Sequence, residues 1–101
     1  MTEGKDIDKA GIDTLHVITD RIRYRICKLV QERPLHINMI AKGIQEERRL
    51  ASYHLNILEE YGVLTSKYEI SMADKSKGKA IRSYWLTPLG KQALTQLEKA
   101  L

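Results

Sequence analysis

Hydrophobic residues recur three or four positions apart in the first third of the chain, which is the spacing of one helix face. Residues 11–18 and residues 20–33 each show this pattern, so two amphipathic helices are expected there. The side-chain oxygen of Thr19 or Asp20 can cap the second helix, and Pro34 stops it because the residue before a proline avoids helical geometry. This part of the chain is therefore expected to form a helical pair.

Two more helices follow a short extended stretch. Residues 35–37 are expected to form a very short strand, and Asn38 can cap a helix that ends near Gly43. The next helix runs from about residue 46 to residue 61, and Gly62 follows it because glycine readily takes the left-handed backbone of a helix end. Two helices joined by a tight turn are typical of a helix-turn-helix.

From Leu64 the hydrophobic spacing changes to every second residue, which predicts a strand. A lysine-rich turn around Gly78 and a second apolar run over residues 80–86 then predict an antiparallel hairpin. Thr87 and Pro88 begin the last helix, since a capping hydroxyl is followed by proline at the first helical position. The positions assigned to one face of the first strand are Leu64, Tyr68, Ile70 and Met72.

These elements follow one another in the order helix, helix, strand, helix, helix, β-hairpin, helix. The fold class expected is therefore α+β, mostly α, with a winged helix-turn-helix architecture. At 101 residues the chain is long enough for one modest core. We expect residues 1–11, which are polar and lack apolar periodicity, to be a loosely ordered segment, and residues 12–101 to form the winged helix DNA-binding domain.

Basic charge is concentrated in two segments. The formal net charge is +4 and the isoelectric point about 9.3, a mild excess that favours polyanionic partners such as nucleic acid. Residues 20–33 hold five basic and two acidic residues, and residues 62–87 hold the same numbers, so each segment carries +3. Segregation of this kind is expected of a surface that binds phosphate.

The helix predicted at residues 46–61 carries a polar face suited to DNA bases. Ala51, Leu55 and Leu58 share its inner side, and His54, beside Leu55, is expected to pack or to bond the backbone. Arginine can bind guanine and asparagine can bind adenine through paired hydrogen bonds, and serine or tyrosine can reach phosphate. An ordinary solvated face is the alternative. The residues assigned to DNA are Arg48, Arg49, Ser52, Tyr53 and Asn56.

The tip of the predicted hairpin, residues 73–80, is basic. Its ammonium groups can contact phosphates or the minor groove beside the helix and add affinity with little sequence information. The alternative is that the lysines only keep a hairpin end soluble and unpaired. The residues assigned to this contact are Lys75, Lys77 and Lys79, joined by Arg82 on the return strand.

Three segments resemble the ArsR-like bacterial and archaeal transcription regulators. TDRIRYRIC is similar to the entry of the family's second helix, SYHLNILEEYGVL to its recognition helix, and YWLTPLGKQAL to the wing strand that leads into the last helix. The resemblance covers about residues 14–101. It implies a winged helix that binds double-stranded DNA as a homodimer, with the first and last helices of the two protomers in contact.

Both outer helices are rich in leucine and isoleucine, in agreement with a two-fold interface of that kind. A dimer would place two recognition helices about one turn of DNA apart on a palindromic site. The residues assigned to the dimer interface are Ile12, Leu15, Ile18, Leu94, Leu97 and Leu101.

The sequence offers little for metal, cofactor or redox chemistry. Metal-sensing members of the family carry cysteines before the recognition helix, or acidic and histidine ligands in the last helix, and the segments INMIAKGI and PLGKQALTQLEKAL have neither. Within one predicted helix, Asp13 and His16 are the one pair of a histidine and a carboxylate three or four positions apart, the spacing that a metal site would need. Cys27 stands alone in an apolar pattern and is expected to be a core residue. We expect no metal and no cofactor.

The function expected is a dimeric double-stranded DNA-binding transcription regulator, with the helix at 46–61 in the major groove and the wing at 73–80 on the backbone or minor groove. No catalytic constellation is present, so no enzyme is expected. No apolar stretch suits a signal peptide or a membrane span, which favours a cytoplasmic protein without membrane contact. Because residues 45–61 carry −2, a winged helix that binds a protein partner is one alternative. An architectural DNA-binding protein with little sequence preference is another.

Overall fold

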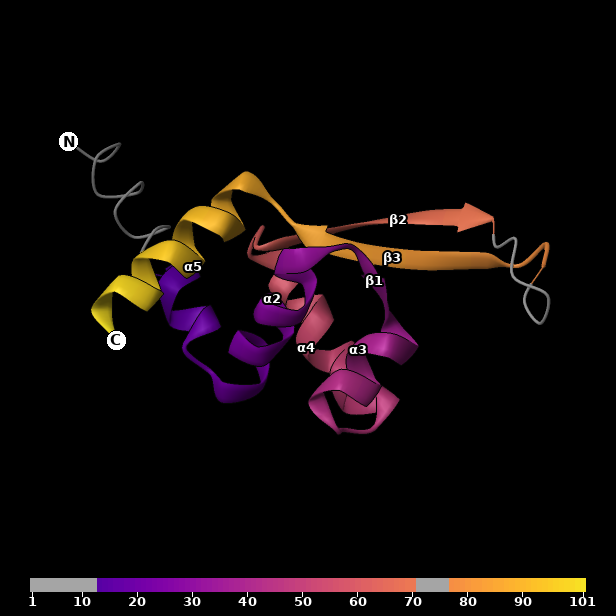
Figure 1. Ribbon diagram of the computed structural model, residues 1–101, viewed down its shortest axis with the longest axis horizontal. Helices are drawn as coiled ribbons and strands as arrows, with labels where there is room; N and C mark the ends of the chain where they lie inside the picture. The colour runs from indigo at the N-terminus through magenta and orange to yellow at the C-terminus, as the bar shows by residue number, and fades with distance from the viewer. Residues whose placement is uncertain (1–12, 71–76) are drawn as a thin grey trace.

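The computed structural model describes residues 13–70 and 77–101, and Figure 1 shows how its helices and sheet are arranged. Residues 13–18 are helical. The later elements confirm the expected order and the α+β class. The expected loose order of residues 1–11 lies outside the described residues. In chain order the elements are α2 (Arg21–Glu32), β1 (Leu35–His36), α3 (Ile37–Ile44), α4 (Arg48–Glu60), β2 (Leu64–Ile70), β3 (Ala80–Leu86) and α5 (Pro88–Ala100).

α3 and α4 are the two helices of the helix-turn-helix, and both ends of α3 differ from the sequence expectation. Asn38 does not cap it, because the short strand keeps the backbone extended only as far as His36, which is the N-cap and makes no side-chain capping bond. The helix continues past Gly43, and the turn is made by Gln45 in the left-handed region (φ 58°). The N–H of Gln45 closes the helix by donating to two carbonyls of its last turn.

The other helix starts follow capping chemistry. Of the two residues proposed to cap α2, Asp20 does so, since its Oδ2 accepts hydrogen bonds from the N–H groups of Ile22 at 3.0 Å and Arg23 at 3.1 Å. Thr87 caps α5 as expected, because its hydroxyl oxygen accepts the N–H of Gly90 at 2.9 Å. These two caps fix where α2 and α5 begin against the sheet.

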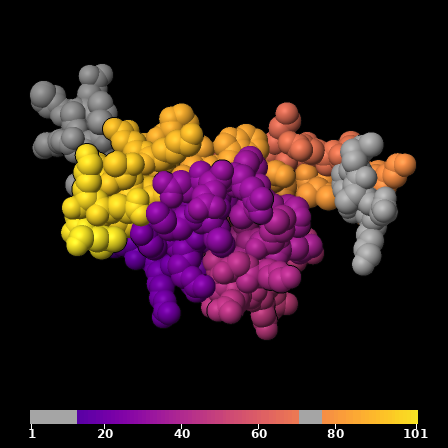
Figure 2. All heavy atoms as spheres, in the orientation of Figure 1, coloured from indigo at the N-terminus to yellow at the C-terminus, as the bar shows by residue number. Residues whose placement is uncertain are grey.

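The three strands form an antiparallel sheet in the order β1-β3-β2. Leu35 of β1 pairs with Tyr84 of β3, and Leu64 at the start of β2 pairs with Leu86 at the end of β3. Gly62 follows α4 and precedes β2 with a φ of 75°, which agrees with the left-handed helix end predicted for it. Figures 1 and 2 show that the hairpin of β2 and β3 extends beyond the helical body at one end of the molecule.

This extension limits how much of the hairpin belongs to the core. Leu64 is 2% exposed, whereas Tyr68 and Ile70 on the same face of β2 are 66% and 64% exposed. The predicted strand is confirmed. In the described residues, however, no helix covers the outer half of β2. Met72, the fourth residue assigned to this face, lies outside the described residues.

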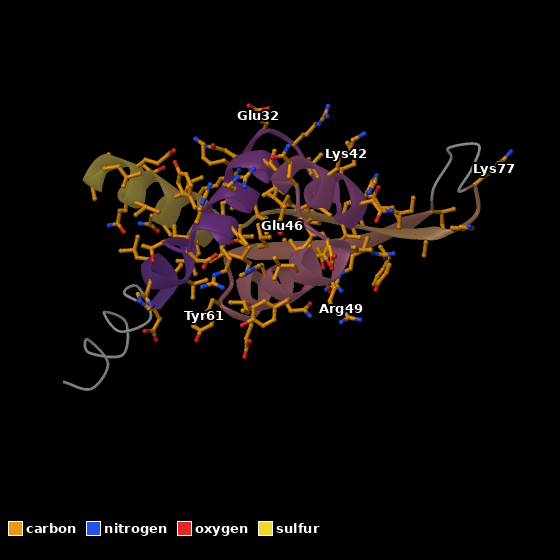
Figure 3. All side chains as sticks on the ribbon, turned by 90° about the horizontal axis from the view of Figure 1, so that it is seen from below. Glu32, Lys42, Glu46, Arg49, Tyr61 and Lys77 are labelled. Atoms are coloured by element: carbon orange, nitrogen blue, oxygen red, sulfur yellow. The ribbon has the colours of Figure 1, made fainter. Side chains whose placement is uncertain are left out.

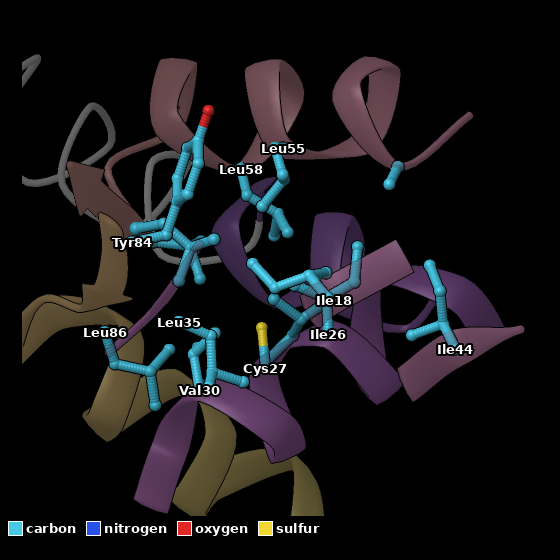
Figure 4. Close-up of a cluster of buried hydrophobic side chains, with 14 of the residues drawn as sticks. Ile18, Ile26, Cys27, Val30, Leu35, Ile44, Leu55, Leu58, Tyr84 and Leu86 are labelled. Atoms are coloured by element: carbon cyan, nitrogen blue, oxygen red, sulfur yellow. The ribbon is translucent and has the colours of Figure 1, made fainter. Parts of the chain in front are cut away.

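The core lies where α2 and α4 meet the inner half of the sheet (Figure 4). Ile26 and Cys27 of α2 and Leu55 and Leu58 of α4 are fully buried there. Burial of each large aliphatic side chain is worth about 1.5–3 kcal/mol, so these contacts determine how α4 sits on the body. Within residues 13–70 and 77–101, no helix has the length and apolar character needed to span a bilayer.

Candidate nucleic-acid interface

The polar side of α4 is turned to solvent because its apolar side is fixed in the core. Ala51, Leu55 and Leu58 are 0% exposed, whereas Tyr53 on the opposite side is 58% exposed. Figure 3 shows Arg49 projecting from α4 to the outside of the molecule. At 100° per residue the five residues assigned to DNA fall within an arc of about 140°. The structure therefore brings together Arg48, Arg49, Ser52, Tyr53 and Asn56 on one face, with Ser52 half-buried and the others exposed.

A groove separates the start of α4 from the hairpin. Arg48 lines it on the helix side, His36 lines it at the start of α3, and Tyr68 and Lys79 line it on the hairpin side. Every charged side chain among its lining residues is basic. A groove of that charge favours an anion such as phosphate. The sequence analysis did not assign His36 or Tyr68 to the DNA-binding surface, because the position of each depends on how β1 and the hairpin pack beside α4.

The hairpin carries exposed lysines beyond this groove. Lys77 and Lys79 are both exposed, and Figure 3 shows Lys77 at the far end of the hairpin from the helices. Gly78 between them has a φ of 84°, the backbone that a tight hairpin turn requires and that glycine adopts without strain. Lys75, the third lysine assigned to the wing, lies outside the described residues.

Arg82, assigned with these lysines to DNA, has partners within the chain. Its Nη2 lies 2.5 Å from Oε1 of Glu59 near the end of α4, and its Nε donates to Oγ of Ser66 at 2.8 Å. It is paired with Tyr68, so it lies between the Leu64–Leu86 pair at the base of the hairpin and the tip. The guanidinium is thus held by α4 and β2, a pairing that the strand pattern did not predict.

His54 lies on the inner side of α4. It is buried, and its Nδ1 is 3.0 Å from Nη1 of Arg23 in α2. Nε of the same arginine donates to the carbonyl of Val17 at 2.7 Å. The expectation that His54 packs inside is confirmed, although its partner is a side chain instead of the backbone. α4 is therefore tied to α2 by a polar contact as well as by the core.

Comparison with solved structures identifies the fold. No protein-family model and no curated protein matches the chain in sequence. A structure described as a possible transcriptional regulator for arsenical resistance shares 26% identity, with 87% of this chain and 82% of the other aligned at a TM-score of 0.67. The chain has the winged helix-turn-helix fold of the ArsR-like regulators.

Two further structures share this winged helix fold. Mb0332 from Mycobacterium bovis, a homodimeric DNA-binding domain and possible ArsR-family regulator, is 15% identical over 95% of this chain and 80% of its own, with a TM-score of 0.69. The transcriptional repressor CouR, bound to a 23-mer DNA duplex, is 18% identical over 97% of this chain and 68% of its own, with a TM-score of 0.64. The antiparallel hairpin of β2 and β3 is the wing of this fold.

The residues assigned to a dimer interface are not equally exposed on the surface of the protomer. Ile18 and Leu94 are 0% and 1% exposed, so they belong to the protomer's own core, and their assignment to an outer surface is corrected. Each of the two helical segments packs one apolar face against the protomer's own core, and Ile18 and Leu94 lie on those faces. Leu15 and Leu97 are half-buried and Leu101 is 85% exposed. Ile12 lies outside the described residues.

Part of the basic charge on α2 is also used within the winged helix. Nζ of Lys28 lies 2.7 Å from Oε2 of Glu98 in α5, and the hydroxyl of Tyr24 donates to the same oxygen at 3.1 Å. The Lys28 hydrogen bond is the main cause that lowers the pKa of Glu98. Lys28 therefore joins α2 to α5.

No metal centre is formed by the described parts of the winged helix. In residues 13–70 and 77–101, no group of three or more His, Cys, Asp or Glu side chains is arranged to hold a metal ion. Cys27 is buried as expected for a core residue, and burial raises the pKa of its thiol to about 12. The thiol is therefore protonated near neutral pH and unreactive.

Proposed function

We propose that the chain is a dimeric, sequence-specific regulator of transcription that binds double-stranded DNA without catalysing a reaction. In this proposal residues 12–101 form the DNA-binding domain, α4 enters the major groove, and the wing lies on the backbone or in the minor groove. The observation that carries the proposal is the polar face of α4, which borders a groove whose charged side chains are all basic. A duplex laid on that face meets arginine, serine, tyrosine and asparagine in one arc.

The roles within this interface follow from side-chain chemistry. Arg48, Arg49 and Asn56 read base edges, because each can make paired hydrogen bonds to a purine. Tyr53 and Ser52 contact phosphates or base edges. Lys77 and Lys79, with Lys75, supply phosphate affinity from the wing. CouR is described as bound to a DNA duplex and Mb0332 as a homodimeric DNA-binding domain, and both share this fold.

A protein-binding winged helix was the main alternative, and its support was the negative charge of residues 45–61. Glu59 supplies part of that charge, but its carboxylate is neutralised by Arg82 in the structure. Glu46 and Glu47 lie just before α4, close to the positive end of its dipole. The negative charge that α4 presents to DNA is therefore smaller than the net charge of −2 counted over residues 45–61.

Selection of bound sequences from random duplex DNA tests the proposal. We expect one enriched, near-palindromic sequence. The double variant Arg48→Ala, Arg49→Ala should bind the selected duplex at least about a hundredfold more weakly, because each good paired contact contributes about 1–3 kcal/mol. Lys91→Ala, Lys99→Ala is the control, since it removes two equally charged, exposed residues of α5.

Other outcomes of this selection would contradict the proposal. Salt-sensitive binding without enrichment would indicate an architectural DNA-binding protein. Absence of binding to any duplex at low salt, with a stable protein complex recovered from cells, would indicate the protein-binding alternative. An equal loss of affinity in both double variants would show that α4 contributes charge and no base recognition.

A further inference from the structure

Three polar side chains form a closed triangle between the wing and the end of α4. Arg82 of β3 donates to Glu59 of α4 at 2.5 Å and to Ser66 of β2 at 2.8 Å. The hydroxyl of Ser66 donates in turn to the other oxygen of Glu59 at 2.6 Å. Both carboxylate oxygens and two guanidinium nitrogens are therefore used, and three different elements meet in one hydrogen-bonded unit.

Aromatic rings flank the guanidinium of this triangle. The central carbon of Arg82 lies 5.6 Å from the ring centre of Tyr68 and 5.1 Å from that of Tyr84. The side chains of Arg82 and Glu59 are only 34% and 23% exposed. Partial removal from water strengthens both the ion pair and the cation–π contacts relative to an exposed surface pair. Arg82 is consequently held in one orientation where the wing passes the end of α4.

The outer half of the wing has no comparable support. Beyond the Tyr68–Arg82 pair, the described residues 69–70 and 77–80 are all exposed, so no core side chain among them fixes the direction of the hairpin. A two-stranded hairpin without a packed face is only marginally rigid in water. The direction in which Lys77 and Lys79 point therefore depends on how the wing is joined to α4 at Arg82.

We propose that Glu59 and Arg82 are positioning residues that set the wing relative to the recognition helix. They hold the hairpin so that the wing lysines and Arg48 reach the same duplex. This inference rests on the proposed DNA-binding function, and it gives Arg82 a role different from the phosphate contact that the sequence suggested. Loss of either partner leaves both DNA-contacting surfaces intact but no longer aligned.

Substitution of Glu59 separates positioning from direct contact. If Arg82 bound phosphate, Glu59→Gln would release its guanidinium and remove a negative charge, so DNA binding would tighten. Under the positioning role, Glu59→Gln weakens binding of the selected duplex by about fivefold, within the range measured for coupled polar networks. Glu60→Gln is the matched control, because it removes the same charge from the exposed neighbouring position of α4.

A second variant keeps the positive charge at position 82 and removes the paired hydrogen bonds of the guanidinium. Arg82→Lys retains a cation that can bind phosphate but lacks the planar fork that reaches Glu59 and Ser66 together. We expect it to weaken binding about as much as Glu59→Gln does. Affinity equal to that of the parent protein in Arg82→Lys would overturn the positioning role.

The wing lysines provide a readout that a loss of stability alone would not change. In the parent, Lys77→Ala, Lys79→Ala should lower the slope of log affinity against log salt by about four, because the proposed dimer has two wings and each lost phosphate contact contributes about one unit. In a Glu59→Gln background the same double substitution should change the slope by less than one, because the wing is already misaligned. An unchanged effect of the lysine substitutions in that background would overturn the inference.

A measurement without DNA makes the test independent of the proposed function. Spin labels at Lys77→Cys and Glu60→Cys report the distance between the wing and α4, and the native Cys27 is buried and does not interfere. We expect Arg82→Lys to broaden the distribution of that distance relative to the parent. An unchanged distribution would overturn the inference, whereas failure of the parent to bind any duplex, with broadening observed, would refute only the DNA-binding function.

Discussion

Nη1 of Arg23 in α2 lies 3.0 Å from Nδ1 of His54 in α4. A guanidinium has only donors, so Nδ1 must accept and the imidazole is neutral, with its proton on Nε2. Burial is the main cause that lowers the pKa of His54, Asp20 and Glu46 oppose it, and Arg23 reinforces it. Protonation of His54 would place two cations against each other beneath the recognition helix.

This contact predicts a loss of stability at acid pH. The pKa of His54 is lower in the folded protein than the ordinary value of 6.5, so the unfolded chain takes up the proton first as pH falls below that value. Stability therefore declines from pH 6.5 down to the folded-state pKa and then levels off as far as His54 is concerned. His54→Gln keeps an acceptor for Arg23 but cannot titrate.

Urea unfolding of both proteins at about pH 7.5 and about pH 5.5 measures this contribution. We expect the parent to lose more free energy of unfolding between the two values than His54→Gln does. His16 and His36 are present in both proteins, so their effects cancel in the difference. An identical loss in both proteins would show that His54 is protonated without penalty in the folded state.

Gly90 predicts an unusual sign for a helix substitution. Alanine normally stabilises a helix by about 1 kcal/mol relative to glycine. At Gly90, however, a Cβ atom would overlap the backbone carbonyl oxygen of Val63, which also accepts the N–H of Thr87 at 3.0 Å. We expect Gly90→Ala to lower the free energy of unfolding by about 2–4 kcal/mol, measured by urea denaturation.

Gly43 supplies the control for that substitution. A Cβ atom there would meet only the end of the Leu29 side chain, which can rotate away. Gly43→Ala should therefore change the stability by no more than about 1 kcal/mol. Equal destabilisation by the two alanines would mean that the close approach of α5 to Val63 does not restrict residue 90.

The dimer proposal predicts a change of size when α5 is made polar. Leu97→Asp, Leu101→Asp places two charges on the exposed and half-buried end of that helix, where an apolar contact would be lost. We expect the parent to be a dimer at about 10 µM and this variant to be a monomer, by light scattering. Met39→Asp, on the exposed surface of α3, should remain dimeric. A monomeric parent would defeat the proposed interface.

Local sequence patterns were sufficient to predict the order of the helices and strands and the exposed polar face of α4. Ala51, Leu55 and Leu58 share one side of a helix, so burial of that side alone decides that Arg48 and Asn56 face solvent. Thr87 and Gly62 acted as expected because a cap and a left-handed turn depend only on neighbouring residues. For these two residues the local sequence was enough.

Contacts between distant residues were not predictable in the same way. Arg82 sits among basic residues in the sequence, yet its partner Glu59 is 23 positions away, and only the packing of the wing on α4 brings them together. Ile18 and Leu94 showed the same limit, because a helical stripe identifies an apolar face without saying whether its own chain or a second copy covers it. Gln45 made a turn that glycine was expected to make, since the chain must reverse just after Ile44.

The ratio of two affinities tests the central claim most directly. The dissociation constant for the selected duplex should be compared with that for a scrambled duplex of equal length and composition, at one physiological salt concentration. A regulator that reads bases through α4 should prefer the selected duplex by at least about a thousandfold. Equal affinity for the two duplexes would contradict the assignment of α4 as a recognition helix.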